Sequence, residues 1–392
     1  MKILHVNSYF YWEGGGPVRV IYDLVHGLAE RNHEVVVYTT DEGPLHRLTD
    51  RDKIQLDRRV SIRYFKCVNN WMAHRWRLQL SPQMLNAFNT SVKDFDIIHI
   101  HESRGFSNFC VWYYAQKYGV PYVLQAHGGL TKRLEQQSMS FVFSKYAFDA
   151  AIGYRTIQGA SKVIALTDSE AQQYKQNGVK PGKIEVVPNG IDLSNFEDLP
   201  TKGSWRKRYG IDDNQRIMLF VGRLNKTKGI DLLLKAFKEA SSVIDDLKLV
   251  LMGPDSGIRA SLESLVQELE LETQVLFTGF VDQREKIEAL VDSELFVTPQ
   301  FYGFPITFLE ACACGTPILT TSKGGELDWI DNEVGLVAEY NKNSLSEAMI
   351  NIMQQESLRQ SFGRRAKRVV REQFSLDKIV DKTETIYRQC TV

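Results

Sequence analysis

The chain has 392 residues, of which 43% are hydrophobic and 24% are charged, the composition of an ordinary globular protein. That composition excludes a disordered tail, a collagen and a small disulfide scaffold. Lys and Arg together number 48, as do Asp and Glu, so no bulk positive field indicates nucleic-acid binding.

Length, cysteine usage and hydropathy further limit the number of domains, the kinds of cysteine site and the compartment. At roughly 150 residues per domain, the length predicts two or three domains. The five cysteines include no C-x-x-C pair, which argues against a disulfide framework or a Cys-rich zinc site and favours a reducing compartment. No apolar run approaches the roughly 20 residues that span a bilayer, and the first residues do not resemble a secretion signal. We therefore expect a cytoplasmic protein.

Charge divides the chain into two parts. Up to Pro188 there are 23 basic and 17 acidic residues, whereas the remainder has 25 and 31. All eight histidines lie in the first part. This asymmetry suggests two domains with different tasks.

In the first part, short apolar runs alternate with helical stretches. The expected strands are Lys2–Asn7, Glu34–Thr40, Val60–Phe65, Asp96–His101, Pro121–Gln125, Lys162–Leu166 and Lys183–Val187. The expected helices are 18–28, Pro82–Val92, Asn108–Tyr118, Leu134–Gly159 and Ser169–Asn177. Because these strand runs are short and mostly continuous, they predict a parallel sheet covered on both faces.

The pattern starts again after a polar stretch, Pro188 to about Gly203, that reads as a linker. The expected strands are Ile217–Val221, Leu247–Met252, Val275–Thr278, Leu295–Thr298, Pro317–Thr320 and Gly335–Ala338. The expected helices are Ile230–Ala240, Ile258–Leu269, Gln283–Val291, Ile306–Cys314 and most of Ser344–Gln389.

The predicted fold class is therefore α/β, with two Rossmann-like doubly wound domains. We expect these domains at residues 1–190 and 191–373, and a C-terminal helix at 374–392 that packs back toward the N-terminal domain. Ligands of such sheets bind outside the carboxyl ends of the strands. We therefore expect the site in a central cleft that the two domains face.

Three segments that follow expected strands carry candidate binding residues. Gly14-Gly15-Gly16-Pro17 precedes a helix, where backbone N–H groups favour an anion, although a plain flexible loop explains it equally well. Arg223 and Lys228 also precede a helix and suit a diphosphate, with a solvated basic loop as the alternative. Glu310 lies on an apolar helix start, where its carboxylate matches a vicinal diol or else accepts from first-turn N–H groups.

The ordered series of such segments resembles glycosyltransferase family 4, whose members are retaining enzymes of the GT-B fold. The segments are GGGP, DIIHIHE, ALTDSE followed by VVPNGID, FVGRLNKTKG and GFPITFLEACACGTPILTT, and they extend over essentially the whole chain. The resemblance implies a nucleotide-sugar cosubstrate, with a UDP-sugar favoured, and no other cofactor. It implies that Gly16, Arg223 and Lys228 bind the donor diphosphate and that Glu310 binds the ribose.

The resemblance also implies residues around the transferred sugar. His127, in QAHGG, matches the histidine that lines the transfer site and is the catalytic candidate. Tyr302 replaces the first glutamate of the family's E-x7-E motif, and with Gly303 and Phe304 it is expected to contact the donor sugar. A phenol carries no charge near pH 7, so this departure leaves the identity of the sugar open.

Other histidines and carboxylates near strand ends are weaker candidates. His99 and His101 share one face of DIIHIH, but no third metal ligand is evident. His101 and Glu102 are acceptor or cleft candidates, whereas His99 and His5 are expected to be packed strand residues. Asp94-Phe95-Asp96 has the D-x-D pattern of metal-dependent sugar transferases but precedes a strand, so we expect no essential metal.

A basic and aromatic segment is a candidate for membrane contact. Arg51–Leu80 has eight basic residues together with Trp71, Met72 and Trp76, and this mixture suits an anionic membrane surface. Lys132–Tyr146 is a second candidate. An anionic acceptor sugar and a solvated loop with its aromatics folded inward are the alternatives.

These inferences lead to one main expectation and two alternatives. We expect a retaining glycosyltransferase that moves a sugar from a nucleotide-sugar to a glycan or lipid-linked acceptor in cell-surface polysaccharide or glycoconjugate synthesis. We do not expect nucleic acid as a partner. We expect peripheral attachment to the cytoplasmic face of a membrane. The alternatives are a GT-B-fold sugar-nucleotide epimerase and a non-catalytic subunit that binds a nucleotide-sugar.

Overall fold

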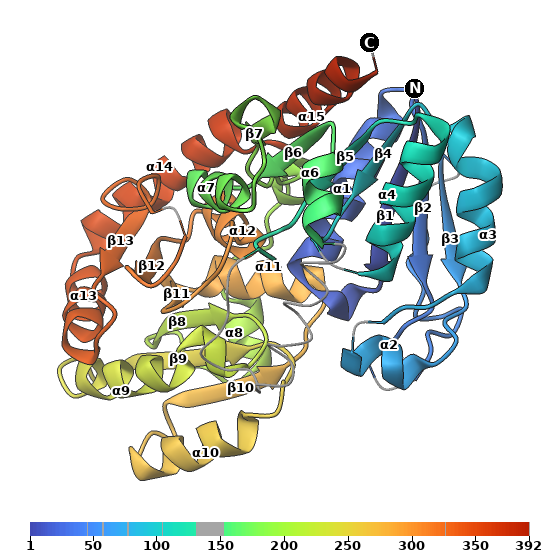
Figure 1. The fold of residues 1–392 in the computed structure, drawn as a ribbon. Coiled ribbons are helices and arrows are strands. Elements are labelled where there is room, and N and C mark those ends of the chain that lie inside the picture. The colour runs from blue at the N-terminus through green and yellow to red at the C-terminus, as the bar shows by residue number, and fades with distance from the viewer. Residues whose placement is uncertain are drawn as a thin grey trace. The chain divides into compact units, whose positions relative to one another are not determined.

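The computed structural model describes residues 1–44, 46–56, 59–76, 78–103, 105–130, 153–325 and 327–391. The chain forms two compact units, the first from Met1–Asn189 with Leu376–Val392 and the second from Gly190–Ser375. Each unit has its own parallel sheet with helices around it (Figure 1). This architecture confirms the α/β class with two Rossmann-like domains.

The first unit has the strand order β3-β2-β1-β4-β5-β6-β7 in its described residues. The strands are β1 (Lys2–Tyr9), β2 (Glu34–Thr40), β3 (Val60–Phe65), β4 (Ile97–Ile100), β5 (Tyr122–Gln125), β6 (Lys162–Ala165) and β7 (Ile184–Val186). The α-helices are α1 (Gly16–Glu30), α2 (Asn70–Trp76), α3 (Pro82–Ser91), α4 (Phe106–Tyr118), α6 (Tyr154–Gly159), α7 (Asp168–Gln176) and α15 (Leu376–Cys390).

Both faces of this sheet are buried. Successive strand residues point to opposite sides, and they pack into two different apolar clusters. Leu4 and Val6 of β1 belong to one apolar cluster with residues of α3 and α4, whereas Ile3 belongs to a second cluster with residues of α1 and α15. The helix α15, red in Figure 1, contributes buried Val380 and Tyr387 to that second cluster. The C-terminal helix is therefore part of the core of the first unit.

The second unit has the strand order β10-β9-β8-β11-β12-β13. The strands are β8 (Arg216–Val221), β9 (Leu247–Met252), β10 (Val275–Gly279), β11 (Leu295–Thr298), β12 (Ile318–Thr321) and β13 (Gly335–Ala338). The α-helices are α8 (Ser204–Arg208), α9 (Ile230–Ser241), α10 (Arg259–Glu268), α11 (Gln283–Asp292), α12 (Ile306–Cys314), α13 (Lys342–Gln354) and α14 (Glu356–Gln373).

In each sheet the direction of winding reverses beside the first strand. The chain runs outward from β1 to β3 and returns to β4 on the other side of β1, and it does the same around β8 and β11. Open parallel sheets bind ligands outside the carboxyl ends of the strands at such a reversal. The segments after β1 and β4, and after β8 and β11, are therefore where ligands are expected.

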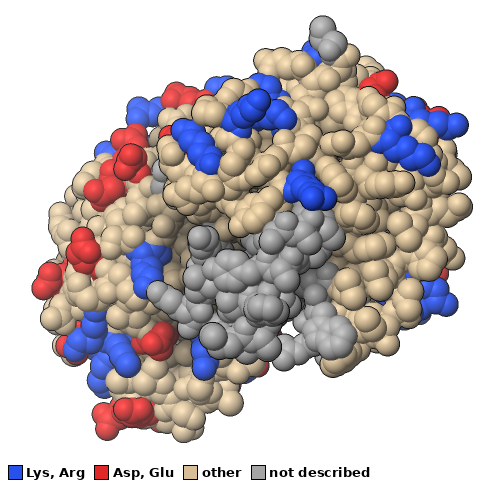
Figure 2. Space-filling view, viewed as in Figure 1, with Lys and Arg blue, Asp and Glu red and all other residues tan. Residues whose placement is uncertain are grey.

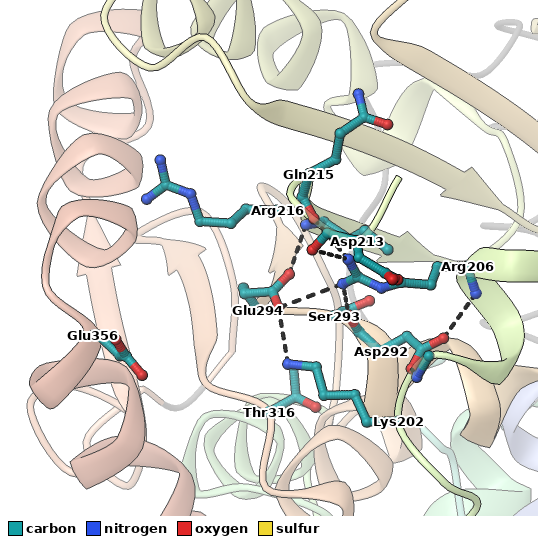
Figure 3. Close-up of polar contacts among 12 residues, drawn as sticks. Lys202, Arg206, Asp213, Gln215, Arg216, Asp292, Ser293, Glu294, Thr316 and Glu356 are labelled. Atoms are coloured by element: carbon teal, nitrogen blue, oxygen red, sulfur yellow. Dashed lines mark hydrogen bonds and ion pairs between the residues drawn. The ribbon is translucent and has the colours of Figure 1, made fainter. Parts of the chain in front are cut away.

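The segments at the amino ends of β8 and β11 are held by a polar network (Figure 3). Arg206 of α8 donates to four carbonyl oxygens at 2.9 to 3.2 Å, those of Asp212, Asp213, Gln215 and Asp292. The Asp292 carboxylate accepts from the Arg206 N–H at 2.8 Å, and the Glu294 carboxylate accepts from the Ile217 N–H at 2.7 Å. These bonds join the end of α11 to the start of β8, so we assign this network to the fold.

One helix was not predicted, one predicted helix is described only in part, and one predicted linker makes a long-range contact. The helix α2 is not predicted, because Asn70–Trp76 lacks a repeated apolar spacing. Of the helix expected at Leu134–Gly159, only α6 falls within the described residues, and positions up to 152 lie outside them. The boundary between the two units falls between Asn189 and Gly190, within the stretch predicted as a linker, and Ile191 in this stretch donates its N–H to the carbonyl of Phe374 at 2.9 Å.

The surface shows mixed charge. On the face drawn in Figure 2, Lys and Arg side chains lie in several separate groups rather than in one continuous area. The balanced composition is therefore matched by interspersed charges on this face. Among the described residues, no helix has both the length and the apolar character needed to cross a bilayer.

Candidate functional site

The loop after β8 brings basic residues to the start of a helix. The Asn225 side chain accepts from the N–H of Thr227 at 2.9 Å and starts a short 3-10 turn over Lys226–Lys228. Gly229, with φ of 65°, then leads directly into α9, so Lys228 stands just before that helix. Arg223 is exposed in the same loop. A cation just before a helix N-terminus, with a second cation in the same loop, suits a diphosphate.

This loop contacts the segment after β11. A Cβ built on Gly229 would lie 3.3 Å from the Cβ of Pro299 and 3.0 Å from the hydroxyl of Tyr340. After β9, a Cβ on Gly253 would lie only 2.1 Å from the carbonyl oxygen of Gly222. Glycine at these positions lets the backbones of neighbouring strand ends approach closely, and so the carboxyl edge of the sheet is compact.

Glu310 is a buried carboxylate with one unused oxygen. Its residue is 1% exposed on α12, and its Oε1 accepts from Lys286 Nζ at 2.7 Å and from Gln283 Nε2 at 3.0 Å. Its Oε2 is buried without a hydrogen-bond partner among the described residues. Such an oxygen is costly unless a ligand supplies a donor. The carboxylate is held by side chains of α11, so the alternative in which it caps its own helix is not supported.

Tyr302 belongs to a chain of side-chain hydrogen bonds. The Gln300 amide donates to the Tyr302 hydroxyl at 2.8 Å, and the Tyr340 hydroxyl donates to the Gln300 carbonyl oxygen at 3.2 Å. Tyr340 is also the residue that lies against Gly229. Tyr302, which replaces the first glutamate of the E-x7-E motif, is therefore linked through the side chains of Gln300 and Tyr340 to the basic loop after β8.

The two residues after Tyr302 have different surroundings. Gly303 has φ of 67°, a left-handed conformation that favours glycine. The Phe304 ring is buried against Trp329 and Phe374, with centroid separations of 5.3 and 5.1 Å. The ring of Phe304 therefore belongs to the core, and only its backbone remains a candidate for sugar contact.

In the first unit, the glycine loop after β1 forms the start of α1. Gly15 has φ of 89° and is the N-cap, and Gly16 is the first helical residue. A Cβ on Gly14 would lie 2.8 Å from Val18 and 2.9 Å from Tyr9, so a side chain would displace the loop. As a glycine, this N-cap residue supplies no side-chain hydrogen bond to the helix start. The geometry is compatible with the predicted approach of a phosphate to Gly16.

His127 follows β5 in a strained conformation. Its φ of 50° is unusual for a residue with a Cβ and costs on the order of 1–2 kcal/mol. The adjoining peptide groups are held by α7, because the Tyr174 hydroxyl accepts from the Ala126 N–H at 3.0 Å and Glu170 Oε1 accepts from the Gly128 N–H at 2.7 Å. Strain that the surroundings maintain at one residue is typical of functional positions.

Further histidines lie behind His127. His101 Nδ1 lies 3.0 Å from His127 Nε2, and His101 Nε2 lies 2.7 Å from His5 Nδ1. His99 Nδ1 lies 2.6 Å from the Tyr387 hydroxyl. Burial lowers the pKa of His5 to about 3 and that of His127 to about 4, and it also lowers the pKa of His99 and of His101 well below the usual value. The four rings are therefore neutral at pH 7.

This cluster bears on two expectations. No third metal ligand beside His99 and His101 was evident from the sequence, but the structure supplies a candidate, because one nitrogen from each of these and His5 lie within 4.8 Å of one another. The structure also buries His101 completely and engages both of its ring nitrogens, so it offers no nitrogen to an acceptor. Glu102 is half-buried, and its carbonyl oxygen accepts from Asn108 at 2.9 Å.

Several supporting residues were not found by sequence reasoning. Glu170 lies in the ALTDSE segment, which was quoted for the family resemblance without a role for this residue. Lys286 and Gln283 occupy positions on an amphipathic helix that carry no distinctive signal. His5 lies in a buried apolar strand, where a histidine usually indicates only packing.

The candidate membrane segments are described in part. Lys132–Tyr146 lies outside the described residues, as do positions 57, 58 and 77 of Arg51–Leu80 and the side chains at 74–76. Lys53 forms an ion pair with Asp50 at 2.6 Å. Val68 and Trp71 are 60% and 61% exposed. Large apolar side chains are thus exposed within a basic segment.

Comparisons with known proteins agree with this architecture. The Glycosyltransferase Family 4 model matches residues 14–195, and the Glycosyl transferases group 1 model matches residues 201–369. An N-acetyl-alpha-D-glucosaminyl L-malate synthase of Bacillus anthracis is 26% identical, covering 98% of this chain and 96% of its own.

Two solved structures show the same fold over almost the whole chain. Sucrose-phosphate synthase from Thermosynechococcus elongatus has a TM-score of 0.81 at 23% identity, covering 99% of this chain and 98% of its own. HepE of Anabaena in complex with UDP and glucose has a TM-score of 0.77 at 18% identity, covering 99% of this chain and 100% of its own.

The fold and the matches define the class of protein. Two Rossmann-like units with these strand orders are the architecture of GT-B glycosyltransferases. The two family models, one for each unit, identify the chain as a glycosyltransferase. The two family models together span most of both units. The chain belongs to glycosyltransferase family 4.

Proposed function

We propose that this protein is a retaining glycosyltransferase that uses a nucleotide-sugar, with a UDP-sugar favoured, and extends a glycan or lipid-linked acceptor in cell-surface polysaccharide or glycoconjugate synthesis. The observation that carries the proposal is the Oε2 atom of Glu310, buried and without a protein donor among the described residues. A ribose supplies hydroxyl donors for such an oxygen. The complex of HepE with UDP and glucose supports the choice of a uridine nucleotide.

The donor diphosphate is proposed to bind Arg223 and Lys228. Their charges and the start of α9 favour the extra negative charge that develops when the sugar departs. In this proposal these groups stabilise the leaving diphosphate without an essential metal. Gly16, at the start of α1, is proposed to bind donor phosphate through the N–H groups of that helix start.

The proposed chemistry follows from retention of configuration, which the family resemblance implies. The bond between the anomeric carbon and the diphosphate oxygen breaks, and the acceptor hydroxyl oxygen bonds to that carbon on the same face. The hydroxyl proton passes to the departing phosphate oxygen, so no protein nucleophile is required. His127 contacts the sugar, and Tyr302 and Gly303 lie in the segment expected to select it.

The role of Glu310 is tested by Glu310→Gln. Losing a charge-assisted hydrogen bond to the ribose is expected to weaken UDP binding by roughly tenfold or more. Glu285→Gln is the matched control, because Glu285 lies on α11 and accepts from the Tyr209 hydroxyl at 2.7 Å. Isothermal titration calorimetry with UDP measures both variants, and unchanged affinity in a folded Glu310→Gln protein removes the ribose role.

Product analysis separates the proposed reaction from its two alternatives. An epimerase converts a nucleotide-sugar without an acceptor, whereas a non-catalytic subunit binds it without turnover in the presence of membrane extract. The proposed transferase releases UDP only when an acceptor is present. NMR of the anomeric proton in the product then reports whether configuration is retained.

The membrane part of the proposal rests on Val68 and Trp71. We propose that these exposed side chains, with the basic residues of Arg51–Leu80, contact an anionic membrane surface. Trp71→Ala is expected to reduce co-sedimentation with vesicles that contain phosphatidylserine. Tyr113→Ala, which removes an aromatic ring that is 50% exposed on α4, is the control. Equal binding of the wild type and Trp71→Ala contradicts the proposal.

A further inference from the structure

Three histidines form a line from the middle of the first sheet to its carboxyl edge. His5 of β1 is paired in register with His99 of β4, and His101 comes two residues later, just after β4. His127 follows the next strand, β5. The rings of His5 and His101 stack with centroids 5.0 Å apart, and those of His101 and His127 with centroids 5.3 Å apart.

The hydrogen bonds along this line are mutually dependent. A neutral imidazole has one N–H group and one nitrogen lone pair. Since both nitrogens of His101 face another histidine, at 2.7 and 3.0 Å, it donates to one neighbour and accepts from the other. Only two arrangements of the protons satisfy both contacts, one with every N–H directed toward His127 and one with every N–H directed toward His5.

The inner end of the line distinguishes these arrangements. His5 Nε2 is buried without a hydrogen-bond partner among the described residues. When the N–H groups point toward His5, this atom is a buried N–H without an acceptor, which folded proteins rarely tolerate. When the N–H groups point toward His127, His5 Nε2 carries no proton and has only an unused lone pair. The unpartnered N–H is then His127 Nδ1, which is also buried but stands after β5 at the carboxyl edge of the sheet, where a water molecule or a ligand can accept from it. The second arrangement is therefore less unfavourable, and it places the proton of His127 on Nδ1.

We propose that His5 and His101 are positioning residues that keep the proton of His127 on Nδ1, so that this nitrogen donates a hydrogen bond to an oxygen of the transferred sugar. His127 Nδ1 is itself buried and has no partner among the described residues, as expected for an atom that awaits a ligand. An imidazole in water favours the proton on Nε2, so the line of histidines reverses the intrinsic preference. The sugar as ligand rests on the proposed function, whereas the proton positions do not.

The first test is NMR of the full chain labelled with ¹⁵N-histidine, at pH 7.5 and without ligand. Two-bond proton–nitrogen correlations identify which ring nitrogen carries the proton, and single histidine variants assign the signals. The expected result is an Nδ1–H form for His127, His101 and His5. An Nε2–H form, or a charged ring, at His127 overturns the proposal.

The second test changes the donor at the inner end. In His5→Asn the side-chain NH₂ group can occupy nearly the same position as Nδ1 and still donates to His101, so His127 is expected to keep its Nδ1 proton. In His5→Leu the donor is lost, and His127 is expected to shift toward Nε2–H. The matched control is Tyr387→Phe, which removes the hydroxyl beside His99 and leaves the line intact.

Kinetics of the same variants separate positioning from packing. His5→Leu is expected to lower kcat roughly tenfold while UDP affinity is unchanged, and His5→Asn is expected to recover most of the loss. If both variants lose activity equally with an unchanged His127 tautomer, His5 acts through packing alone and the proposal fails.

A bound metal ion is the competing explanation for the cluster. Such an ion would replace the proton between His5 and His101, because a ligating nitrogen carries no proton. The proposal would be overturned by stoichiometric metal in the purified protein together with His5 and His101 signals that change on adding a chelator. The NMR result does not depend on turnover, so a chain that transfers no sugar but shows the Nδ1 form would refute the proposed function alone.

Discussion

At the scale of single residues, the site in the first unit depends on how the backbone around His127 is held. Glu170 Oε1 accepts from the Gly128 N–H at 2.7 Å, and its Oε2 accepts from the Leu166 N–H at 2.7 Å. Burial raises the pKa of Glu170, although the two backbone donors favour its charged form. One buried carboxyl group thus connects the end of β6 to the strained turn.

Replacing this carboxyl group is expected to affect transfer more than nucleotide binding. Glu170→Ala removes the carboxylate that accepts from the Gly128 and Leu166 N–H groups, at about 1–3 kcal/mol for each lost bond, and releases the strained φ of His127. We expect a lower free energy of unfolding and a reduced kcat. UDP affinity should be unchanged, because Arg223, Lys228 and Glu310 lie in the second unit and Gly16 lies on a different element, α1. Denaturant unfolding and initial-rate kinetics measure these quantities, with exposed Ser169→Ala as control. Normal kcat in Glu170→Ala would show that the turn needs no such support.

The candidate site was predictable where a residue type stands at the end of an apolar run. Arg223, Lys228 and Glu310 follow such runs closely, so their neighbourhood could be inferred from the order of elements. The partners Lys286 and His5 could not, because their contacts depend on helix packing and on the register between β1 and β4. Apolar pattern predicts that strands exist but does not specify which residues become neighbours.

At the scale of elements, the helices α1 and α15 pack closely at Gly27 of α1, which has no side chain. A Cβ on Gly27 would lie 2.8 Å from Val380 Cγ2. Arg31, at the end of α1, also donates to the carbonyl oxygen of Asp377 at 3.0 Å. A glycine inside a helix normally lowers its stability, so its presence here is explained by the close approach of the two helices.

In the variant Gly27→Ala, two effects change the free energy of unfolding in opposite directions. Helix propensity favours alanine by about 1 kcal/mol, whereas overpacking against a stiff β-branched side chain costs about 1–3 kcal/mol. We expect net destabilisation, and we expect Val380→Ala to relieve it, so that the double variant is more stable than the sum of the single effects. Denaturant unfolding of the four proteins completes the cycle. Additive changes, or a stabilising Gly27→Ala, would contradict the inferred helix contact.

At the scale of the whole molecule, the distribution of histidines predicts different acid sensitivity in the two units. His5, His99, His101 and His127 are buried with lowered pKa values, about 3 for His5 and about 4 for His127. Unfolded histidines bind protons below about pH 6.5, whereas these folded ones do not until lower pH. The second unit, Gly190–Ser375, contains no histidine.

The free energy of unfolding of the first unit should therefore fall as the pH is lowered from about 6.5 toward 4. Each such histidine contributes a slope of up to about 1.4 kcal/mol per pH unit, because the unfolded state binds the additional proton. Hydrogen exchange with mass spectrometry follows both units in one experiment. Loss of protection should begin in β1, β4 and β5 and spare the second unit. Equal protection of both units down to pH 4 would refute the assignment of buried neutral histidines.

Much of the fold was predictable because buried parallel strands read as apolar runs bounded by turns. The bounds of β2, β9, β11, β13 and α12 coincide with the expected ranges. The contact of Ile191 with Phe374 was not predictable, since it joins residues far apart in a polar stretch that has no periodic pattern. Local pattern therefore identifies the elements of both units, and long-range pairing completes them.

The central claim, that this chain binds a nucleotide-sugar through its second unit, is tested most directly by a thermal-shift panel. UDP-, GDP-, ADP- and TDP-sugars are compared with and without EDTA, for the wild type and Glu310→Gln. A ligand that binds only the native state raises the Tm in proportion to the logarithm of its concentration above Kd. We predict a rise with the UDP-sugar that EDTA does not change and that Glu310→Gln reduces. No rise with any of the four donors, or an equal rise in Glu310→Gln, would contradict the account.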